Sequence, residues 1–207
     1  MAKTMTKTLT LIPAALGCRA HSGWAALVAL GGTAQSPVIL ERLRIELADP
    51  GVAGSKQPYH AAAEMDFKYA EKFIGRSINE ARQLARQGLR AVAGRVREKG
   101  YEVVGCGILL ASGRELPALA ATLASHALIH TAEGELFREA LAHASEQCHL
   151  PVTKVREREL FDHAVAGLRV PLGELQRRIA ELGQTIGPPW RQDEKFASLA
   201  AWLALVA

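Results

Sequence analysis

Two histidines and a glutamate in the second half of the chain have the spacing of metal ligands. His126 and His130 are four residues apart in a segment that we expect to be helical, and Glu133 follows three residues later. Side chains at this spacing lie on one face of a helix. Two imidazoles placed in this way can bind a zinc ion, with a carboxylate as third ligand or general base. The residues between the histidines are Ala-Leu-Ile rather than those of an HExxH motif, so hydrogen-bonded histidines without a metal are the alternative.

A second group of polar side chains lies in and just after residues 49–59, a segment rich in Gly, Pro and Ser that predicts a loop. Lys56, Tyr59 and His60 bring a cation, a phenol and an imidazole close together there. Functional groups often lie on loops. The composition therefore suggests a ligand-binding loop, and an ordinary solvated loop is the alternative.

The third group consists of arginines on a predicted helix that covers residues 66–99. That segment carries nine Lys and Arg against four Asp and Glu, a net charge of +5. Arg82, Arg86 and Arg90 are spaced four apart, so they form a stripe along the helix. Such a stripe can follow the phosphates of a nucleic acid. The alternative is the solvated face of an amphipathic helix.

The composition of the chain limits the classes of protein to which these side chains can belong. The chain has 207 residues, of which 49% are apolar, which excludes disordered and collagen-like proteins and predicts a single domain over residues 1–207. The net charge of +4 is compatible with an anionic partner. Three widely spaced cysteines without a CxxC motif indicate reduced thiols, so we expect a cytoplasmic protein. The apolar stretch 9–16 is short and contains Pro13, so we expect an entry strand there rather than an export signal, and no membrane span.

The elements that must position these side chains can be read from apolar periodicity. Three apolar segments separated by turns predict an antiparallel meander, and helices and strands alternate after it. The expected strands are 8–18, 23–30, 38–47, 101–111 and 151–155, and the expected helices are 66–99, 121–146, 160–166, 172–182 and 193–206. This order predicts an α/β fold, a mixed sheet with helices on both faces.

The same order resembles the ribonuclease H-like fold, and within it the RuvC-type Holliday-junction resolvases. Residues 16–28, with Ser22-Gly23-Trp24, resemble the strand-turn-strand that opens those proteins. Residues 103–110, the helix that follows and Pro151-Val152 resemble their central strand-helix-strand. Residues 193–200 resemble the start of their last helix. The resemblance implies a three-strand antiparallel meander extended by parallel strands.

The resemblance also shows which residues depart from the family. Active relatives hold two magnesium ions between several carboxylates, and one of these carboxylates lies on the first strand. In this chain the first acidic residue is Glu41, and an ungapped match places Leu16 at the position of that carboxylate. The central strand has no acid between Glu102 and Glu115. A RuvC-like protein that lacks the usual catalytic acids, and with them ordinary nuclease activity, is what the resemblance implies.

If the fold is correct, Arg19 and His21 lie at the end of the first strand and face Asp193 and Glu194, the acids that match the family pattern. A guanidinium beside a carboxylate at a helix N-terminus forms a favourable ion pair. Two interpretations stay open for this corner. One is a structural ion pair, and the other is a remodelled anion-binding or catalytic pocket.

Three functions follow from these patterns. The preferred one is a RuvC-like domain that binds nucleic acid or acts as an interaction module, without a cofactor. The second is a hydrolase or nuclease with a remodelled site and a divalent metal, built from Arg19, His21, His126, His130, Asp193 and Glu194. The third is a structural homo-oligomer. The enzyme requires that its six side chains share one cleft.

Overall fold

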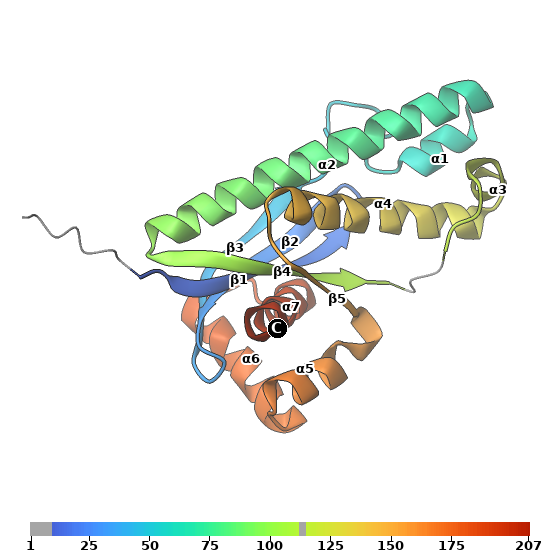
Figure 1. Ribbon diagram of the computed structural model, residues 1–207. Coiled ribbons are helices and arrows are strands. Elements are labelled where there is room, and N and C mark those ends of the chain that lie inside the picture. Colours follow the sequence, from blue (N-terminus) through green and yellow to red (C-terminus); the bar gives the residue numbers. More distant parts are fainter. Residues whose placement is uncertain (1–9, 112–114) are drawn as a thin grey trace, which may run out of the picture.

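The fold was obtained as a computed structural model, which describes residues 10–111 and 115–207. A five-stranded sheet in the order β3-β2-β1-β4-β5 forms its centre (Figure 1). β1 (Ile12–His21), β2 (Trp24–Gly32) and β3 (Pro37–Glu46) are an antiparallel meander. β4 (Tyr101–Leu110) runs parallel to β1, and β5 (Val152–Arg156) runs parallel to β4. This is the mixed sheet that the sequence predicts.

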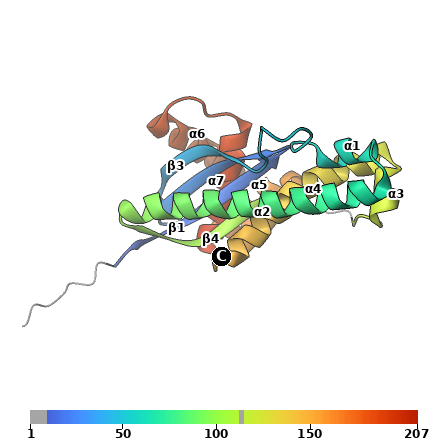
Figure 2. The ribbon, with the colours of Figure 1, turned by 90° about the horizontal axis from the view of Figure 1, so that it is seen from above.

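Helices cover both faces of this sheet, as Figures 1 and 2 show. One face packs against α2 (Phe67–Glu98) and α4 (His126–Gln147). The other face packs against α7 (Gln192–Val206), which is followed outward by α5 (Leu160–Leu168) and α6 (Leu172–Ile186). Three short helices complete the described elements: α1 (Pro58–Ala63), α3 (Leu119–Leu123) and the 3-10 turn η1 (Glu157–Glu159).

Alternation along β1 decides which side chains face which layer. Leu16 and Cys18 are fully buried in the core beneath α2 and α4. Gly17 and Arg19, which alternate with them along the strand, point to the opposite face, toward α7. A Cβ atom added at Gly17 or at Gly107 would overlap the backbone of α7. These two glycines therefore let α7 lie directly on the sheet, and this close packing places the first turn of α7 beside the end of β1.

Three local expectations were wrong. The predicted helix 121–146 is two helices, because Ser125 has extended backbone and starts α4 anew. Residues 58 and 59, predicted as the end of a loop, begin α1, where Pro58 occupies the first turn that proline favours. The first strand was predicted to end at residue 18, but β1 continues to His21, which pairs with Trp24 of β2. Residues 8 and 9 of the predicted first strand lie outside the described residues.

None of the described helices combines the length and the apolar character that a membrane span needs.

Candidate functional site

The end of β1 holds an arginine between two carboxylates. Arg19 donates from Nε and Nη2 to the carboxylate of Glu157, at 3.1 and 2.6 Å, and from Nη1 to Oδ1 of Asp193. Its guanidinium also lies over the ring of Phe196, 5.3 Å from the ring centre. The predicted contact between Arg19 and the start of the last helix is therefore present. Glu157, at the start of η1 directly after β5, is a second partner.

His21 completes this corner. Its Nε2 lies 2.9 Å from Oδ1 of Asp193, and its ring stacks on Trp24 with centroids 4.2 Å apart. Asp193 is thus shared by two residues of β1. The expectation that Glu194 also faces β1 was wrong, because its carboxylate accepts the backbone N–H of Arg191 and caps its own helix. Leu16, the position matched to the family's first carboxylate, lies in the core on the other face of β1.

The charges in this corner compensate one another. Burial raises the pKa of Asp193, but hydrogen bonds from Arg19 and His21 outweigh burial, so this pKa lies below its ordinary value. Burial lowers the pKa of Arg19, and the hydrogen bonds to Glu157 and Asp193 more than reverse that effect. The guanidinium of Arg19 and the carboxylate of Asp193 therefore stay ionised at neutral pH. The position between the two carboxylates is already filled by a cation.

A second cluster lies where α1 meets the start of α4. One ring nitrogen from each of His60, His126 and His130 lies within 4.8 Å of the other two, and Nε2 of His126 is 3.0 Å from Nε2 of His130. Glu133 lies behind His60. Its Oε1 accepts the backbone N–H groups of Tyr59 and His60 and lies 3.2 Å from Nδ1 of His60. In the structure His60, rather than Glu133, is the third side chain beside His126 and His130.

The three residues predicted as a ligand loop are divided between different surroundings. Tyr59 and His60 lie in α1, and the Tyr59 side chain packs against the hydrophobic core. Lys56 precedes the helix and lines a separate hollow with Ser22 and Pro50. The structure therefore does not join Lys56, Tyr59 and His60 into one loop site.

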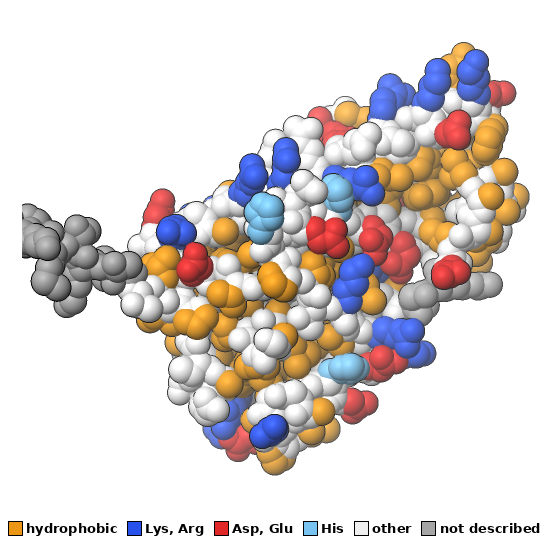
Figure 3. Space-filling view, viewed as in Figure 1, with side chains coloured by type: hydrophobic (Ala, Val, Ile, Leu, Met, Phe, Trp, Pro, Cys, Tyr) orange, Lys and Arg blue, Asp and Glu red, His pale blue; other side chains and the backbone are white. Residues whose placement is uncertain are grey.

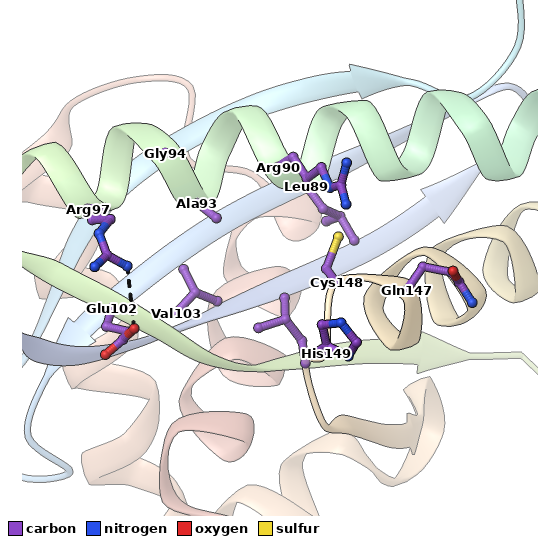
Figure 4. Close-up of a pocket in the computed structure, with 11 residues that line it drawn as sticks. Leu89, Arg90, Ala93, Gly94, Arg97, Glu102, Val103, Gln147, Cys148 and His149 are labelled. Carbon is purple, nitrogen blue, oxygen red and sulfur yellow. Dashed lines mark ion pairs between the residues drawn. The ribbon is translucent and has the colours of Figure 1, made fainter.

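The arginine stripe borders a groove between α2 and α4. Arg82 and Arg86 line a hollow of about 230 Å³ together with His143 and Gln147. Gln147 also lines an adjoining hollow of about 320 Å³. Figure 4 shows that second hollow, with Arg90 on α2 and residues at the end of α4 around it. Lys and Arg side chains follow α2 along the upper edge of the molecule in Figure 3.

These arginines differ from the cations at the C-terminal end of the same helix. Arg82, Arg86 and Arg90 form no ion pair with any residue that the structure describes. In contrast, Arg95 and Lys99 both pair with Glu41. Arg97 pairs with Glu102 at 3.5 Å on the edge of the second hollow (Figure 4). The positive charge of the stripe is therefore available to a partner.

The six side chains of the alternative hydrolase do not form one cluster. Arg19, His21 and Asp193 meet on the face of the sheet that α7 covers. His126 and His130 project from α4, which covers the opposite face, and contact His60. Within residues 10–111 and 115–207, no hydrogen bond or ion pair joins the two groups. They are two separate candidate sites.

Comparison with solved structures finds proteins with this architecture. The chain is similar to T. thermophilus RuvC in complex with Holliday junction substrate, with 10% identity, a TM-score of 0.52, and 93% of this chain and 91% of that chain covered. It is similar to a Thermus thermophilus RuvC structure, with 12% identity, a TM-score of 0.52, and 93% and 92% covered. The fold is ribonuclease H-like. This confirms the fold predicted from the sequence, and at this identity the likeness shows the fold alone.

No protein-family model and no curated protein matches the chain.

Proposed function

We propose that this chain is a RuvC-like domain that binds nucleic acid along α2 and does not cleave it by magnesium chemistry. The observation that carries the proposal is the row of Arg82, Arg86 and Arg90, without ion pairs among the described residues, beside the groove between α2 and α4. The similar RuvC structure that contains a Holliday junction supports nucleic acid as the partner.

The spacing of the stripe suits a phosphate backbone. Residues four apart on a helix are displaced by about 6 Å along its axis, so the three arginines span about 12 Å. A duplex presents about seven phosphate charges over that length. Each guanidinium can donate several hydrogen bonds to phosphate oxygens. The polar side chains of Asn79 and Gln83 in the same hollow offer further donors.

The acidic residues near the arginine stripe bear on the direction in which the nucleic acid extends along α2. Glu135 and Glu139 line a third hollow, which borders Arg82 on the side toward α1. The hollow at the other end contains Arg90, Arg97 and a single acid, Glu102. The two carboxylates make the first region less favourable for phosphates than the second, although Glu135 pairs with Arg138 and Glu139 pairs with Lys154. We therefore propose that the nucleic acid follows α2 from Arg82 toward the start of β4.

The corner around Arg19 does not fit the magnesium ions of active relatives. Such ions need several carboxylate and water oxygens around them. In this structure the end of β1 contributes a guanidinium, and both Glu157 and Asp193 are hydrogen-bonded to it. A divalent cation would have to displace Arg19 and overcome its positive charge. The arrangement supports a structural ion-pair cluster rather than a nuclease centre.

Binding can be tested by fluorescence anisotropy with a labelled four-way junction and a matched DNA duplex. At about 0.15 M salt, loss of three phosphate contacts weakens binding by about a hundredfold, so we expect that loss from the triple variant Arg82→Gln, Arg86→Gln, Arg90→Gln. The control replaces Arg44, Arg158 and Arg177 by Gln, which removes the same charge from exposed side chains already paired with glutamates. The control should bind nearly as wild type does. Equal losses in both triple variants would contradict the proposal.

Cleavage is tested with the same junction and with magnesium or manganese ions. We expect the strands to stay intact. Cleavage by the wild-type protein that disappears in Asp193→Asn would show that the Arg19 corner is catalytic after all.

A further inference from the structure

We propose that His60, His126 and His130 form a transition-metal site that fits Zn²⁺. The three ring nitrogens lie within 4.8 Å of one another, and two of them are 3.0 Å apart. Two nitrogens that bind one tetrahedral zinc ion at about 2.0–2.1 Å are roughly 3.3 Å apart. Small rotations of the exposed rings of His126 and His130 would therefore bring all three nitrogens to ligand distance. This site is distinct from the arginine stripe and does not depend on nucleic-acid binding.

Glu133 prepares His60 for this role. Only 4% of Glu133 is exposed, and its Oε1 lies 3.2 Å from Nδ1 of His60. A carboxylate at Nδ1 accepts the N–H there and leaves the lone pair of Nε2 free to bind a metal. The same oxygen accepts the backbone N–H groups of Tyr59 and His60, which fixes the first turn of α1. Glu133 is therefore a positioning residue.

The burial of Glu133 calls for an explanation that the fold alone does not supply. Its second oxygen, Oε2, is buried and has no hydrogen-bond partner among the described residues. Burying a carboxylate with an unsatisfied oxygen costs free energy. A carboxylate behind a metal-binding histidine is a recurrent arrangement, and it raises the basicity of the ligand. The cost of burial is consistent with that role.

The donor set determines which ion fits. Three imidazoles without a carboxylate in the ligand shell suit Zn²⁺, Cu²⁺, Co²⁺ or Ni²⁺, whereas Mg²⁺ and Ca²⁺ need oxygen ligands. His126 and His130 are exposed, so an ion can enter from solvent. Three protein ligands leave the fourth tetrahedral position for water or for an oxygen of a ligand. The site is therefore open rather than closed like a zinc finger.

The position of the cluster gives the metal a structural effect. Helices α1 and α3 and the start of α4 lie beyond the end of the sheet at which β1 and β4 finish (Figures 1 and 2). His60 belongs to a helix of six residues, and His126 and His130 belong to a helix of 22 residues much later in the chain. An ion bound by all three would link these two segments. At a hundred times its dissociation constant it should raise the melting temperature by about 5–10 °C.

The test uses the full chain without an affinity tag, freed of metal with a chelator. Zn²⁺ is titrated in competition with a chromophoric chelator, and Co²⁺ is added separately because its visible spectrum reports four-coordinate geometry. We expect one Zn²⁺ per chain, and a loss of affinity of at least tenfold in each of His60→Ala, His126→Ala and His130→Ala. Glu133→Gln should weaken binding by about 10–100-fold. The control is His163→Ala, an exposed histidine on α5, which should bind as wild type does.

Two results would overturn the proposal. One is a wild-type chain that takes up no stoichiometric Zn²⁺. The other is a double variant, His126→Ala with His130→Ala, that binds Zn²⁺ as tightly as wild type. Both histidines are exposed on α4, so this variant should fold, and circular dichroism checks that it does. Loss of Zn²⁺ in Cys148→Ser but not in the histidine variants would assign the ion to another site and equally refute this one.

Discussion

Replacing Arg19 by Met removes the positive charge between Glu157 and Asp193 and keeps most of the side-chain volume. Arg19 is 17% exposed, and the two carboxylates are 34% and 27% exposed. The variant therefore leaves two negative charges close together in a half-buried corner without their cation. We expect a folded protein of clearly lower stability.

The size of this loss follows from the exposure of the three groups. Exposed ion pairs contribute about 0.2–1 kcal/mol. Removing one partner of a fully buried pair costs about 3–5 kcal/mol. The Arg19 corner lies between these limits, and solvent screens Glu157 more than Asp193, so we expect a loss of about 2 kcal/mol. For a chain of this size the melting temperature should fall by about 4–8 °C.

The loss should also depend on pH. Burial raises the pKa of Asp193, but Arg19 and His21 outweigh it, so the pKa in the folded state lies below its ordinary value. A lowered pKa contributes stability that is present above the unfolded pKa, about 3.9, and is lost as pH falls through the folded pKa. Arg19→Met lacks most of this contribution. The stability difference between variant and wild type should therefore be largest near neutral pH and should shrink below about pH 4.

Thermal and urea unfolding at several pH values measure both effects. Arg177→Met is the control, since Arg177 is 57% exposed and pairs with exposed glutamates on its own helix. The control should melt close to wild type. An Arg19→Met protein that melts within about 1 °C of wild type at pH 7, or whose deficit is equal at pH 3 and pH 7, would refute the reasoning.

Three further predictions concern the Arg19 corner, Glu41 and the packing of α7 on the sheet. Arg19→Asp should place three carboxylates in one corner, so its melting temperature should rise with millimolar Mg²⁺ or Mn²⁺ while that of wild type stays constant; equal responses would contradict this. Lys99 and Arg95 lower the pKa of Glu41 against the effect of burial, so Glu41→Gln should cost about 1 kcal/mol in urea unfolding at pH 7 and less below pH 4. Gly107→Ala should destabilise by about 1–3 kcal/mol because its Cβ overlaps α7, whereas Gly94→Ala, which has open space around it, should stabilise by about 0.5–1 kcal/mol. Melts that place Gly107→Ala at or above wild type would show that α7 does not lie as close to the sheet as described.

Much of the fold could be predicted because its signals are local. Helix α2 was predicted to within one residue at each end, because Asp66 caps its start by accepting the N–H of Lys68 and Gly100 follows its end. The apolar runs located all five strands. Helix α1 was missed because its six residues are too few to show a period, and the break before α4 was missed because Ser125 stands in an apolar sequence that looks continuous.

The candidate sites depend on contacts that have no local signal. The pair of Arg19 and Asp193 could be predicted only through the fold, which brings the end of β1 to the start of α7. Glu157 stands in an Arg-Glu-Arg-Glu sequence that is typical of solvated segments, and only the end of β5 places it beside Arg19. The sequence indicates His60 only as part of a polar loop with Lys56 and Tyr59. Its approach to His126 depends on how α1 packs against α4, which no spacing in the sequence reveals.

The central claim, that α2 binds phosphates, is tested most directly by the salt dependence of binding. The logarithm of the association constant for a DNA duplex should fall linearly with the logarithm of salt concentration, by about 0.9 for each phosphate neutralised. Replacing Arg82, Arg86 and Arg90 by Gln should make this slope shallower by about 2 to 3, and the control variant of Arg44, Arg158 and Arg177 should keep the wild-type slope. A triple variant of α2 with the wild-type slope would contradict the claim.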